Sequence, residues 1–251
     1  MQKLSVVIIT RNEERNIGRC LSSIKPVADD IVVVDSHSTD ATTRIAQQYA
    51  VRLFQKDWEG YSATKNFGNL QAHYDWILSM DADEALSAPL MQSILTIKGS
   101  LSSPAPFKIN RITNYCGKWI KYGGWNPDIK VRFFDRRVSK WEGSVHEKLT
   151  HINESKIELL EGDLLHYTYY SIEEHKKRFE IYSELAAESL WKEGKRAGLT
   201  KRFLSPVVKF AGDYFFKLGF LDGYYGFHVA RISALATYAK YKKLKEKSNR
   251  K

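Results

Sequence analysis

The sequence predicts an α/β fold in which a mainly parallel sheet is flanked by helices and is followed by a helical C-terminal extension. Strand-like apolar runs alternate with helix-like patterns over the first hundred residues, and the pattern becomes helical from Ser171. Such alternation is typical of βα units that stack around a parallel sheet. We therefore expect a main domain over residues 1–170 and a basic, amphipathic helical extension over residues 171–251.

Residue periodicity predicts the individual elements. Continuous apolar runs rich in β-branched residues indicate buried strands, and apolar residues at helical spacing indicate helices that pack on a sheet. Strands are expected at 4–10, 31–34, 51–54 and 76–80, and helices at 17–24, 41–49, 61–71 and 88–98. A segment rich in aromatic, Gly and basic residues follows, with strand-like pieces at 107–115 and 130–135. We expect this segment to close over a site.

The net charge of +10 lies almost entirely in the C-terminal third. Residues 171–251 hold 18 Lys and Arg against 9 Asp and Glu, a balance of 18 − 9 = +9, which leaves +1 for residues 1–170. Cys20 and Cys116 are too sparse to indicate a disulfide framework, which favours a reducing, cytoplasmic setting. The apolar run at 4–9 is too short for a signal peptide. The apolar region at 203–239 is interrupted by charged residues, so we expect no membrane span.

Polar residues directly follow three of the predicted strands, as Thr10–Glu13, Asp35–Asp40 and Asp81–Glu84. Ligands of open α/β sheets bind beyond the carboxyl ends of the strands. Any one of these segments alone would be read as a helix cap or a solvated turn. Three of them together indicate a binding site at one edge of the sheet.

Asp81 and Asp83 are the sharpest feature of that edge. Two carboxylates one residue apart after a buried strand provide the hard oxygen ligands that Mg²⁺ or Mn²⁺ prefers, commonly together with substrate phosphates. Acids at 81, 83 and 84 would also repel one another unless a cation lay among them. We therefore expect a divalent metal and a diphosphate ligand.

Other phosphate and metal signatures are absent from the sequence. The turn after the first strand lacks G-x-G-x-x-G, and no G-x-x-x-x-G-K-S/T occurs, which disfavours a dinucleotide dehydrogenase or a P-loop enzyme. The seven histidines are scattered without a cysteine partner at ligand spacing, so they give no zinc signature.

Three segments resemble the successive motifs of family 2 glycosyltransferases, namely Ser5–Glu14, Val34–Thr42 and Asp81–Asp83. The resemblance implies the GT-A fold, a Rossmann-like sheet flanked by helices. Further segments look like bacterial lipopolysaccharide-core glucosyltransferases of this family: Gly123–Asp128, Arg132–Phe134, Trp141–Glu147 and Leu165–Thr168. Asn126 departs from the family's usual Tyr, which puts the acceptor contacts in doubt.

The resemblance implies a role for each matching residue. Asp35 matches the acid that hydrogen-bonds a uracil ring, and Asp40 caps the next helix. Asp83 matches the principal metal ligand, and Asp81 is similar to the acid that faces the ribose and the donor sugar, with Ala82 as a spacer in the same donor-binding segment. The remaining matches are Thr10, Arg11, Asn12 and Glu13 around the base and ribose, and Lys65 and Asn66 near the nucleotide and diphosphate. Without the resemblance, Lys65 would be read as a surface charge.

Glu147 is the candidate catalytic base, and His146 belongs to the same catalytic motif. Inversion requires a base that takes the proton of the acceptor hydroxyl as it attacks the anomeric carbon. A β product would then form from an α-linked donor. The alternative for Glu147 is a surface ion pair with Lys148 or Arg132. For His166, a buried structural histidine and a metal ligand are equally favoured.

The basic C-terminal third admits three interpretations. Its amphipathic helices could pack on the main domain, or they could lie on an anionic bilayer surface. Nucleic-acid binding is disfavoured because no nucleic-acid module accompanies the charge. We expect a peripheral protein at the inner face of the bacterial cytoplasmic membrane.

These features together predict a metal-dependent, inverting hexosyltransferase that uses a UDP-sugar, with glucose or a related hexose as the sugar. The expected acceptor is a lipid-linked core oligosaccharide of the bacterial cell envelope. The alternatives are a transferase for another glycan or lipid carrier, a nucleotidyltransferase, and a membrane-surface binding protein with a degenerate site. The intact Asp81, Asp83 and Glu147 argue against a degenerate site.

Overall fold

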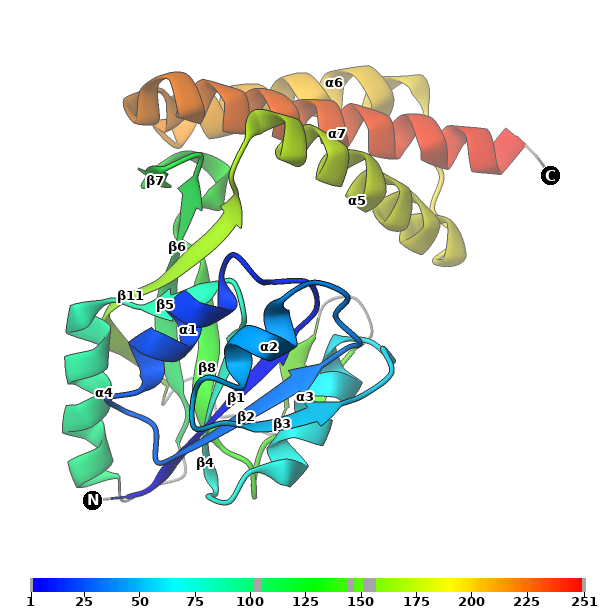
Figure 1. The fold of residues 1–251 in the computed structure, drawn as a ribbon. Coiled ribbons are helices and arrows are strands. Elements are labelled where there is room, and N and C mark those ends of the chain that lie inside the picture. Colours follow the sequence, from blue (N-terminus) through cyan, green and yellow to red (C-terminus); the bar gives the residue numbers. More distant parts are fainter. Residues whose placement is uncertain (1, 102–104, 144–146, 151–156, 250–251) are drawn as a thin grey trace. The chain divides into compact units, whose positions relative to one another are not determined.

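The computed structural model describes residues 2–101, 105–143, 147–150 and 157–249. The chain divides into two compact units (Figure 1). The first comprises Met1–Arg111 and Asp128–His166, and the second comprises Ile112–Pro127 and Tyr167–Lys251. Both units therefore draw on separate stretches of the sequence.

The first unit is built on a sheet whose initial strands are parallel. They lie in the order β3-β2-β1-β4. In β1, Thr10 lies opposite Asp35 and Ile9 lies opposite Asp81, so the carboxyl ends of three strands meet at one edge. The bounds are β1 (Leu4–Thr10), β2 (Asp30–Asp35), β3 (Arg52–Gln55) and β4 (Trp76–Asp81).

Antiparallel strands continue the sheet beyond β4 in the order β8-β6-β11-β5. The pairing of β11 with β5 places His166 opposite Glu84. Strand β7 pairs with β6, and β9 and β10 form a separate ribbon. The bounds are β5 (Glu84–Leu86), β6 (Phe107–Tyr115), β7 (Lys118–Ile120), β8 (Ile129–Asp135), β9 (Trp141–Glu142), β10 (Lys148–Leu149) and β11 (Glu158–Tyr169).

Alternate side chains of β1 point to opposite faces of the sheet, and a different apolar core lies on each face. Val6 and Ile8 pack with residues of α1 and α4, whereas Val7 and Ile9 pack on the α3 side. Gly68 of α3 permits this close approach, because a Cβ atom there would lie 2.5 Å from Val7 Cγ1. The bounds are α1 (Ile17–Ile24), α2 (Thr42–Ala46), α3 (Tyr61–Gln71) and α4 (Ala88–Ser100).

The second unit is mainly helical. Helices α5 and α6 both pack along α7, and a small core forms around Tyr115, Ile120 and Val229. Among the described residues, no helix combines the length and apolar character needed to cross a bilayer. The bounds are α5 (Ile172–Lys192), α6 (Leu199–Ala211) and α7 (Gly223–Asn249), with short helical turns η1 (Gly123–Trp125), η3 (Gly212–Phe216) and η4 (Gly219–Asp222).

The predicted fold class is confirmed: a mixed, mainly parallel sheet is flanked by helices and followed by C-terminal helices. Two details differ. Helix α2 is shorter than the expected helix at 41–49. The expected helical extension is interrupted after residue 211, because α6 ends at Ala211, a π-helical turn follows, and Leu218 has a positive φ of 58°.

Candidate functional site

The loops that follow β1 and β2 are hydrogen-bonded to each other at the carboxyl edge of the sheet. Asn12 donates its backbone N–H to Ser38 Oγ at 2.8 Å and accepts the Thr39 N–H at its Oδ1, also at 2.8 Å. The Glu13 N–H donates to Thr42 Oγ1 at 2.7 Å. These loops are therefore held as one surface.

The residues expected around the base and ribose differ in how much they are already engaged. The Asp35 side chain is buried and accepts hydrogen bonds from the Ser38 backbone and hydroxyl. The Glu13 carboxylate accepts from Asn16 Nδ2 at 2.7 Å. Arg11 is exposed. In the described part of the chain, buried Thr10 Oγ1 has no hydrogen-bond partner.

Asp40 fixes the turn that precedes α2. Its carboxylate accepts the backbone N–H of Thr42 at 2.9 Å and that of Glu14 at 3.2 Å. The N-cap position of α2 is Ala41, whose side chain forms no capping bond. Asp40 thus satisfies backbone donors from both loops at this edge.

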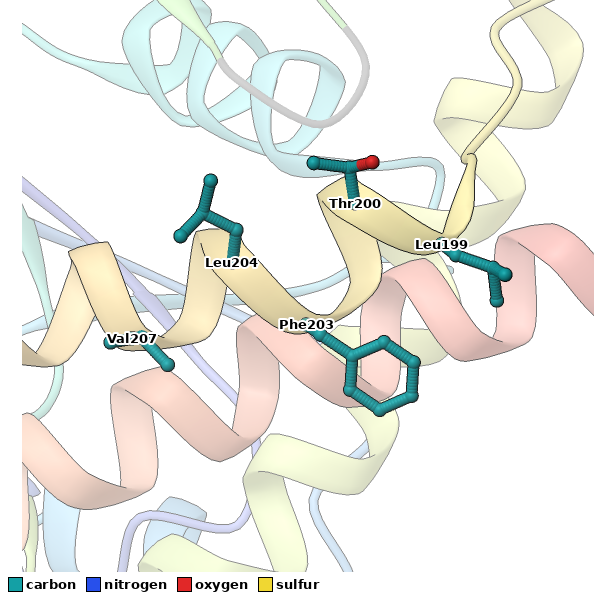
Figure 2. A pocket seen from close by; sticks show the side chains of 5 residues that line it. All are labelled: Leu199, Thr200, Phe203, Leu204 and Val207. Carbon is teal, nitrogen blue, oxygen red and sulfur yellow. The ribbon is translucent and has the colours of Figure 1, made fainter.

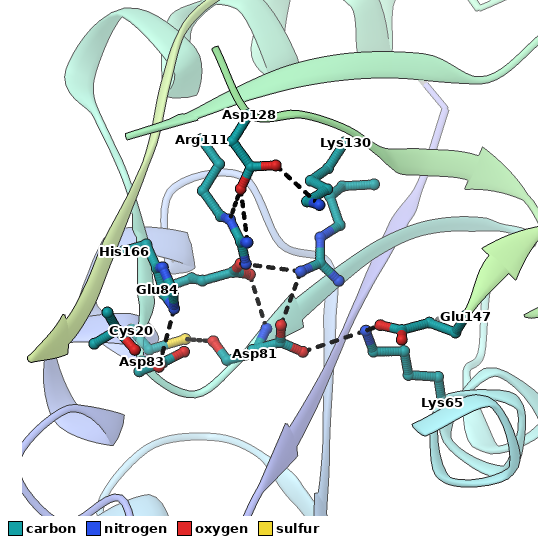
Figure 3. Close-up of polar contacts among 12 residues, drawn as sticks. Cys20, Lys65, Asp81, Asp83, Glu84, Arg111, Asp128, Lys130, Glu147 and His166 are labelled. Carbon is teal, nitrogen blue, oxygen red and sulfur yellow. Dashed lines mark hydrogen bonds and ion pairs between the residues drawn. The ribbon is translucent and has the colours of Figure 1, made fainter. Parts of the chain in front are cut away.

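Asp81, at the end of β4, faces two basic side chains (Figure 3). Arg132 Nη2 lies 2.8 Å from Asp81 Oδ2, and Lys65 Nζ lies 3.4 Å from Asp81 Oδ1. Burial raises the pKa of Asp81, but the nearby charges of Arg132 and Lys65 lower it by more than burial raises it. The pKa of Asp81 is therefore well below its usual range. Asp81 is therefore an anion in the folded protein.

Glu84 contacts the same cluster of charged residues. Its Oε1 lies 3.1 Å from Arg111 Nη1 and 3.0 Å from Arg132 Nη2, and its Oε2 accepts the Asp81 N–H at 2.9 Å. Arg111 also pairs with Asp128 at 2.7 Å. Asp81 and Glu84 need no metal to offset their mutual repulsion, because arginines of the chain already neutralise them. The expectation that repulsion among the acids requires a cation is therefore wrong for these two residues.

Lys65, on α3, connects Asp81 to Glu147. Its side chain is fully buried, its Nζ lies 2.8 Å from Glu147 Oε1, and it lies 4.9 Å from the centre of the Trp141 ring. The reading of Lys65 as a surface charge is therefore wrong. Glu147 forms an ion pair with Lys65, and its charge also acts on Arg132, which was one of the two alternative partners. His146 lies outside the described residues.

Asn66 holds the ribbon that leads to Glu147. Its Nδ2 donates to the Trp141 carbonyl at 2.8 Å, and its Oδ1 accepts the Trp141 N–H at 3.0 Å. This pair of bonds fixes β9 against α3. The side chain of Asn66 therefore supports the segment that carries the candidate base.

Asp83 and His166 lie side by side because β5 and β11 pair. His166 Nε2 is 3.2 Å from Asp83 Oδ2, and both side chains are 15% exposed. Ala82, between the two acids, is buried. Over the described ranges, no group of three or more His, Cys, Asp or Glu residues is arranged to hold a metal. The oxygen and nitrogen donors of this pair nevertheless fit a cation whose other ligands are waters and substrate phosphates.

Sequence reasoning missed the arginines that organise the acids. Arg111 and Arg132 lie on β6 and β8, and Arg132 is 4% exposed within a strand whose next two residues, Phe133 and Phe134, are fully buried. A charged residue beside two aromatics in a buried strand was the available signal. A buried arginine needs a carboxylate partner, and the acids after β4 are the partners here.

The comparisons with known proteins agree with this geometry. The sequence pattern of glycosyl transferase family 2 matches residues 5–96. An uncharacterized glycosyltransferase of Rickettsia typhi is 31% identical over 99% of this chain and 88% of its own length. The chain belongs to glycosyltransferase family 2. The GT-A resemblance is thereby confirmed, and the protein is a nucleotide-sugar glycosyltransferase.

Two further proteins are similar to this glycosyltransferase. The lipopolysaccharide core biosynthesis glycosyltransferase LpsC of Rhizobium meliloti is 27% identical over 95% of this chain and 93% of its own length. The crystal structure of S. aureus TarS 1–349 in complex with UDP-GlcNAc has a TM-score of 0.47 and 16% sequence identity, and covers 99% of this chain and 92% of that one.

Proposed function

We propose that this glycosyltransferase transfers a hexose, with glucose as the first candidate, from a UDP-sugar to a lipid-linked core oligosaccharide, with inversion at the anomeric carbon. The observation that carries the proposal is the ion-paired chain Asp81–Lys65–Glu147. It joins an acid at the donor side of the sheet edge to a carboxylate suited to activate an acceptor. An inverting transferase needs both within one site.

The donor occupies the carboxyl edge of the parallel strands in this proposal. Asp35 receives the uracil ring, and Asp81 faces the ribose and the sugar. Thr10 contributes its unpartnered hydroxyl. The proposed donor-binding residues are Thr10, Arg11, Asn12, Glu13, Asp35, Lys65, Asn66, Asp81 and Ala82.

Asp83 and His166 would hold Mg²⁺ or Mn²⁺. A bound cation supplies Lewis-acid stabilisation of the charge on the departing diphosphate. The adjacent carboxylate and imidazole are the support for this assignment. Lys65 and Arg132, which already lie beside Asp81, balance the negative charge of that acid.

Glu147 acts as the general base. Lys65 holds Glu147 Oε1 in place, and the carboxylate takes the proton of the acceptor hydroxyl while the hydroxyl oxygen attacks the anomeric carbon. The bond from that carbon to the diphosphate oxygen breaks on the opposite face. His146 is proposed to assist within the same motif.

The acceptor assignment is supported by similarity to LpsC along nearly the whole chain. A lipid-linked acceptor would lie at the inner face of a bacterial cytoplasmic membrane. The basic C-terminal helices are proposed to bring the enzyme to that anionic surface. The expected product is part of a cell-envelope polysaccharide.

A panel of nucleotide-sugars tests the donor and the metal together. Thermal stability of the full chain would be measured with UDP-glucose, UDP-galactose, UDP-GlcNAc, GDP-mannose and TDP-glucose, each with and without Mn²⁺. We expect a UDP-hexose to raise the Tm in the presence of Mn²⁺ and to raise it less without the metal. Stabilisation by a non-UDP donor alone, or by none of them, would contradict the proposed function.

A further inference from the structure

Helix α6 exposes half of its circumference as apolar surface. Leu199, Phe203, Leu204, Val207 and Val208 are 55–63% exposed, and none of the residues of α6 is buried. At 100° per residue these side chains span an arc of about 180°. A depression along this helix is lined by Leu199, Thr200, Phe203, Leu204 and Val207, whose side chains are drawn in Figure 2.

Exposed apolar side chains continue along the chain beyond the end of α6. Phe215 and Phe216 of η3 are 57% and 86% exposed, and Leu218, Phe220 and Leu221 are also exposed. Exposed apolar patches this extensive are uncommon on proteins that have no partner there. We call the surface formed by α6 and residues 215–221 the α6 face.

Lysines near the end of α7 form ion pairs with helix α5. Lys247 Nζ lies 2.9 Å from Glu184 and 2.8 Å from Glu188, and Lys243 Nζ lies 3.4 Å from Glu180. These acids belong to α5. Part of the basic C-terminal run therefore fastens α7 to α5, and α7 buries Val229, Ala230, Ile232 and Leu244.

The charge around the α6 face selects its occupant. Residues 195–217 contain six Lys or Arg and one acid, Asp213, which is buried and pairs with Lys209 at 2.9 Å. Lys201 and Lys217 are exposed beside the apolar side chains. A second copy of this chain would bring the same positive charge against it, whereas anionic lipid headgroups would neutralise it.

We propose that the α6 face is the part of the C-terminal helices that enters the headgroup region of an anionic bilayer, with Lys201 and Lys217 at the level of the phosphates. Half-apolar helices flanked by cations lie in this way in the membrane interface. The inference rests on the membrane attachment in the proposed function and assigns that attachment to α6 among the C-terminal helices.

Two matched double variants of the full chain test this placement. Val207→Gln/Val208→Gln changes the α6 face. Ile181→Gln/Leu185→Gln changes α5 residues of the same unit that are 62% and 53% exposed. Binding is measured by co-sedimentation with phosphatidylglycerol and with phosphatidylcholine vesicles. We expect the α6 variant to bind phosphatidylglycerol vesicles at least about ten-fold more weakly, and the α5 variant to match the wild type.

The charge is tested separately with Lys201→Gln/Lys217→Gln, which should weaken binding to phosphatidylglycerol at low salt and leave the weak binding to phosphatidylcholine unchanged. Circular dichroism confirms that each variant is folded. Equal losses in both apolar variants, no loss in the α6 variant, or a dimer of the wild type that Val207→Gln/Val208→Gln dissociates would overturn the inference.

Failure of this inference is distinguishable from failure of the proposed sugar transfer. Stabilisation of the wild type by UDP-sugar and Mn²⁺ does not involve the α6 face, so Val207→Gln/Val208→Gln should retain it. A chain that binds vesicles through α6 but is stabilised by no UDP-sugar would contradict the transferase proposal alone. A chain that is stabilised by a UDP-sugar but does not bind vesicles would contradict the α6 inference and the membrane attachment on which it rests, and would leave the proposed sugar transfer standing.

Discussion

The Lys65 ammonium lies 2.8 Å from Glu147 Oε1, and none of its side chain is exposed. The two residues are 82 positions apart in the sequence. Asp81 Oδ1 lies 3.4 Å from the same ammonium. The buried ammonium of Lys65 therefore connects α3 with the end of β4 and with the segment that carries the candidate base.

Replacing this cation should affect both stability and turnover. Lys65→Gln leaves two carboxylates facing a neutral amide, and removing one partner of a buried ion pair costs roughly 3 kcal/mol. We expect the free energy of unfolding in urea to fall by about that amount. We also expect kcat for sugar transfer to fall at least about ten-fold, since Glu147 loses the contact that holds it.

Lys98→Gln is the matched control for Lys65→Gln. Lys98 is also buried, pairs with Asp29 at 2.6 Å, and lies on α4 away from the acids of the site. It should lower stability while leaving kcat within about two-fold of the wild type at a temperature where both are folded. Equal losses of kcat in both variants would mean that Lys65 acts through stability alone.

The Asp83–His166 pair should decide the response to metal. Asp83→Asn and His166→Gln each keep the approximate size of the side chain but remove a carboxylate or an imidazole donor. We expect the Mn²⁺ concentration needed for half-maximal stabilisation by a UDP-sugar to rise at least about ten-fold in each variant. Isothermal titration calorimetry of Mn²⁺ in the presence of UDP measures the affinity of each variant for the metal.

Asp163→Asn provides the comparison on the same strand as His166. Asp163 Oδ1 accepts a hydrogen bond from Asn110 Nδ2 at 2.6 Å and lies outside the proposed metal pair. This variant should keep the metal response of the wild type. If Asp83→Asn kept it as well, Asp83 would not be a metal ligand.

We expect the charge of Glu84 to stabilise the folded protein, although Glu84 lies in a cluster of acidic residues. Its side chain has no exposed surface and faces both Arg111 and Arg132. Glu84→Gln preserves the shape but removes the charge that both guanidinium groups share, so we expect unfolding free energy to fall by roughly 3 kcal/mol.

The exposed ion pair of Lys140 and Glu142 provides the control for the effect of Glu84→Gln on unfolding free energy. Glu142 lies 2.8 Å from Lys140, with about half of its side chain exposed. Glu142→Gln should change unfolding free energy by less than about 0.5 kcal/mol, because solvent screens such pairs. Comparable effects of the two substitutions would contradict a structural role for the Glu84 charge.

The sequence predicted the strands and the edge of the site because both depend on local patterns. The apolar runs gave β1 and β4 with correct or nearly correct bounds, and strand ends placed Asp35 and Asp81 at one edge. Local periodicity was therefore sufficient for this half of the molecule.

The rest of the site depends on pairings that local patterns do not encode. Strand β11 pairs with β5, which is about 80 residues earlier in the chain, and only this pairing brings His166 to Asp83. The arginines on β6 and β8 reach the acids in the same way. The α6 face was missed because amphipathicity identifies an apolar stripe but does not say whether another helix covers it.

His175 gives the second unit a defined response to pH. Its Nδ1 lies 3.0 Å from the Tyr115 hydroxyl, and the rings of Trp125 and Tyr169 contact its imidazole. Burial, with the nearby charges of Arg178 and His228, lowers the pKa of His175 from 6.5 to about 4. The imidazole therefore stays neutral in the folded protein at a pH where the unfolded chain binds a proton.

The sign of the effect follows from this difference in proton binding. Stability from the neutral imidazole is complete above pH 6.5 and is lost as the pH falls toward 4, by roughly 3 kcal/mol in all. His175→Gln cannot bind this proton in either state. Urea unfolding of both proteins at pH 7.5, 6.5, 5.5 and 4.5 should therefore show the wild type losing its advantage over the variant mainly below pH 6.5. Parallel curves would show that His175 titrates alike in the folded and unfolded chains, because the other titrating groups are common to both proteins and cancel in the difference.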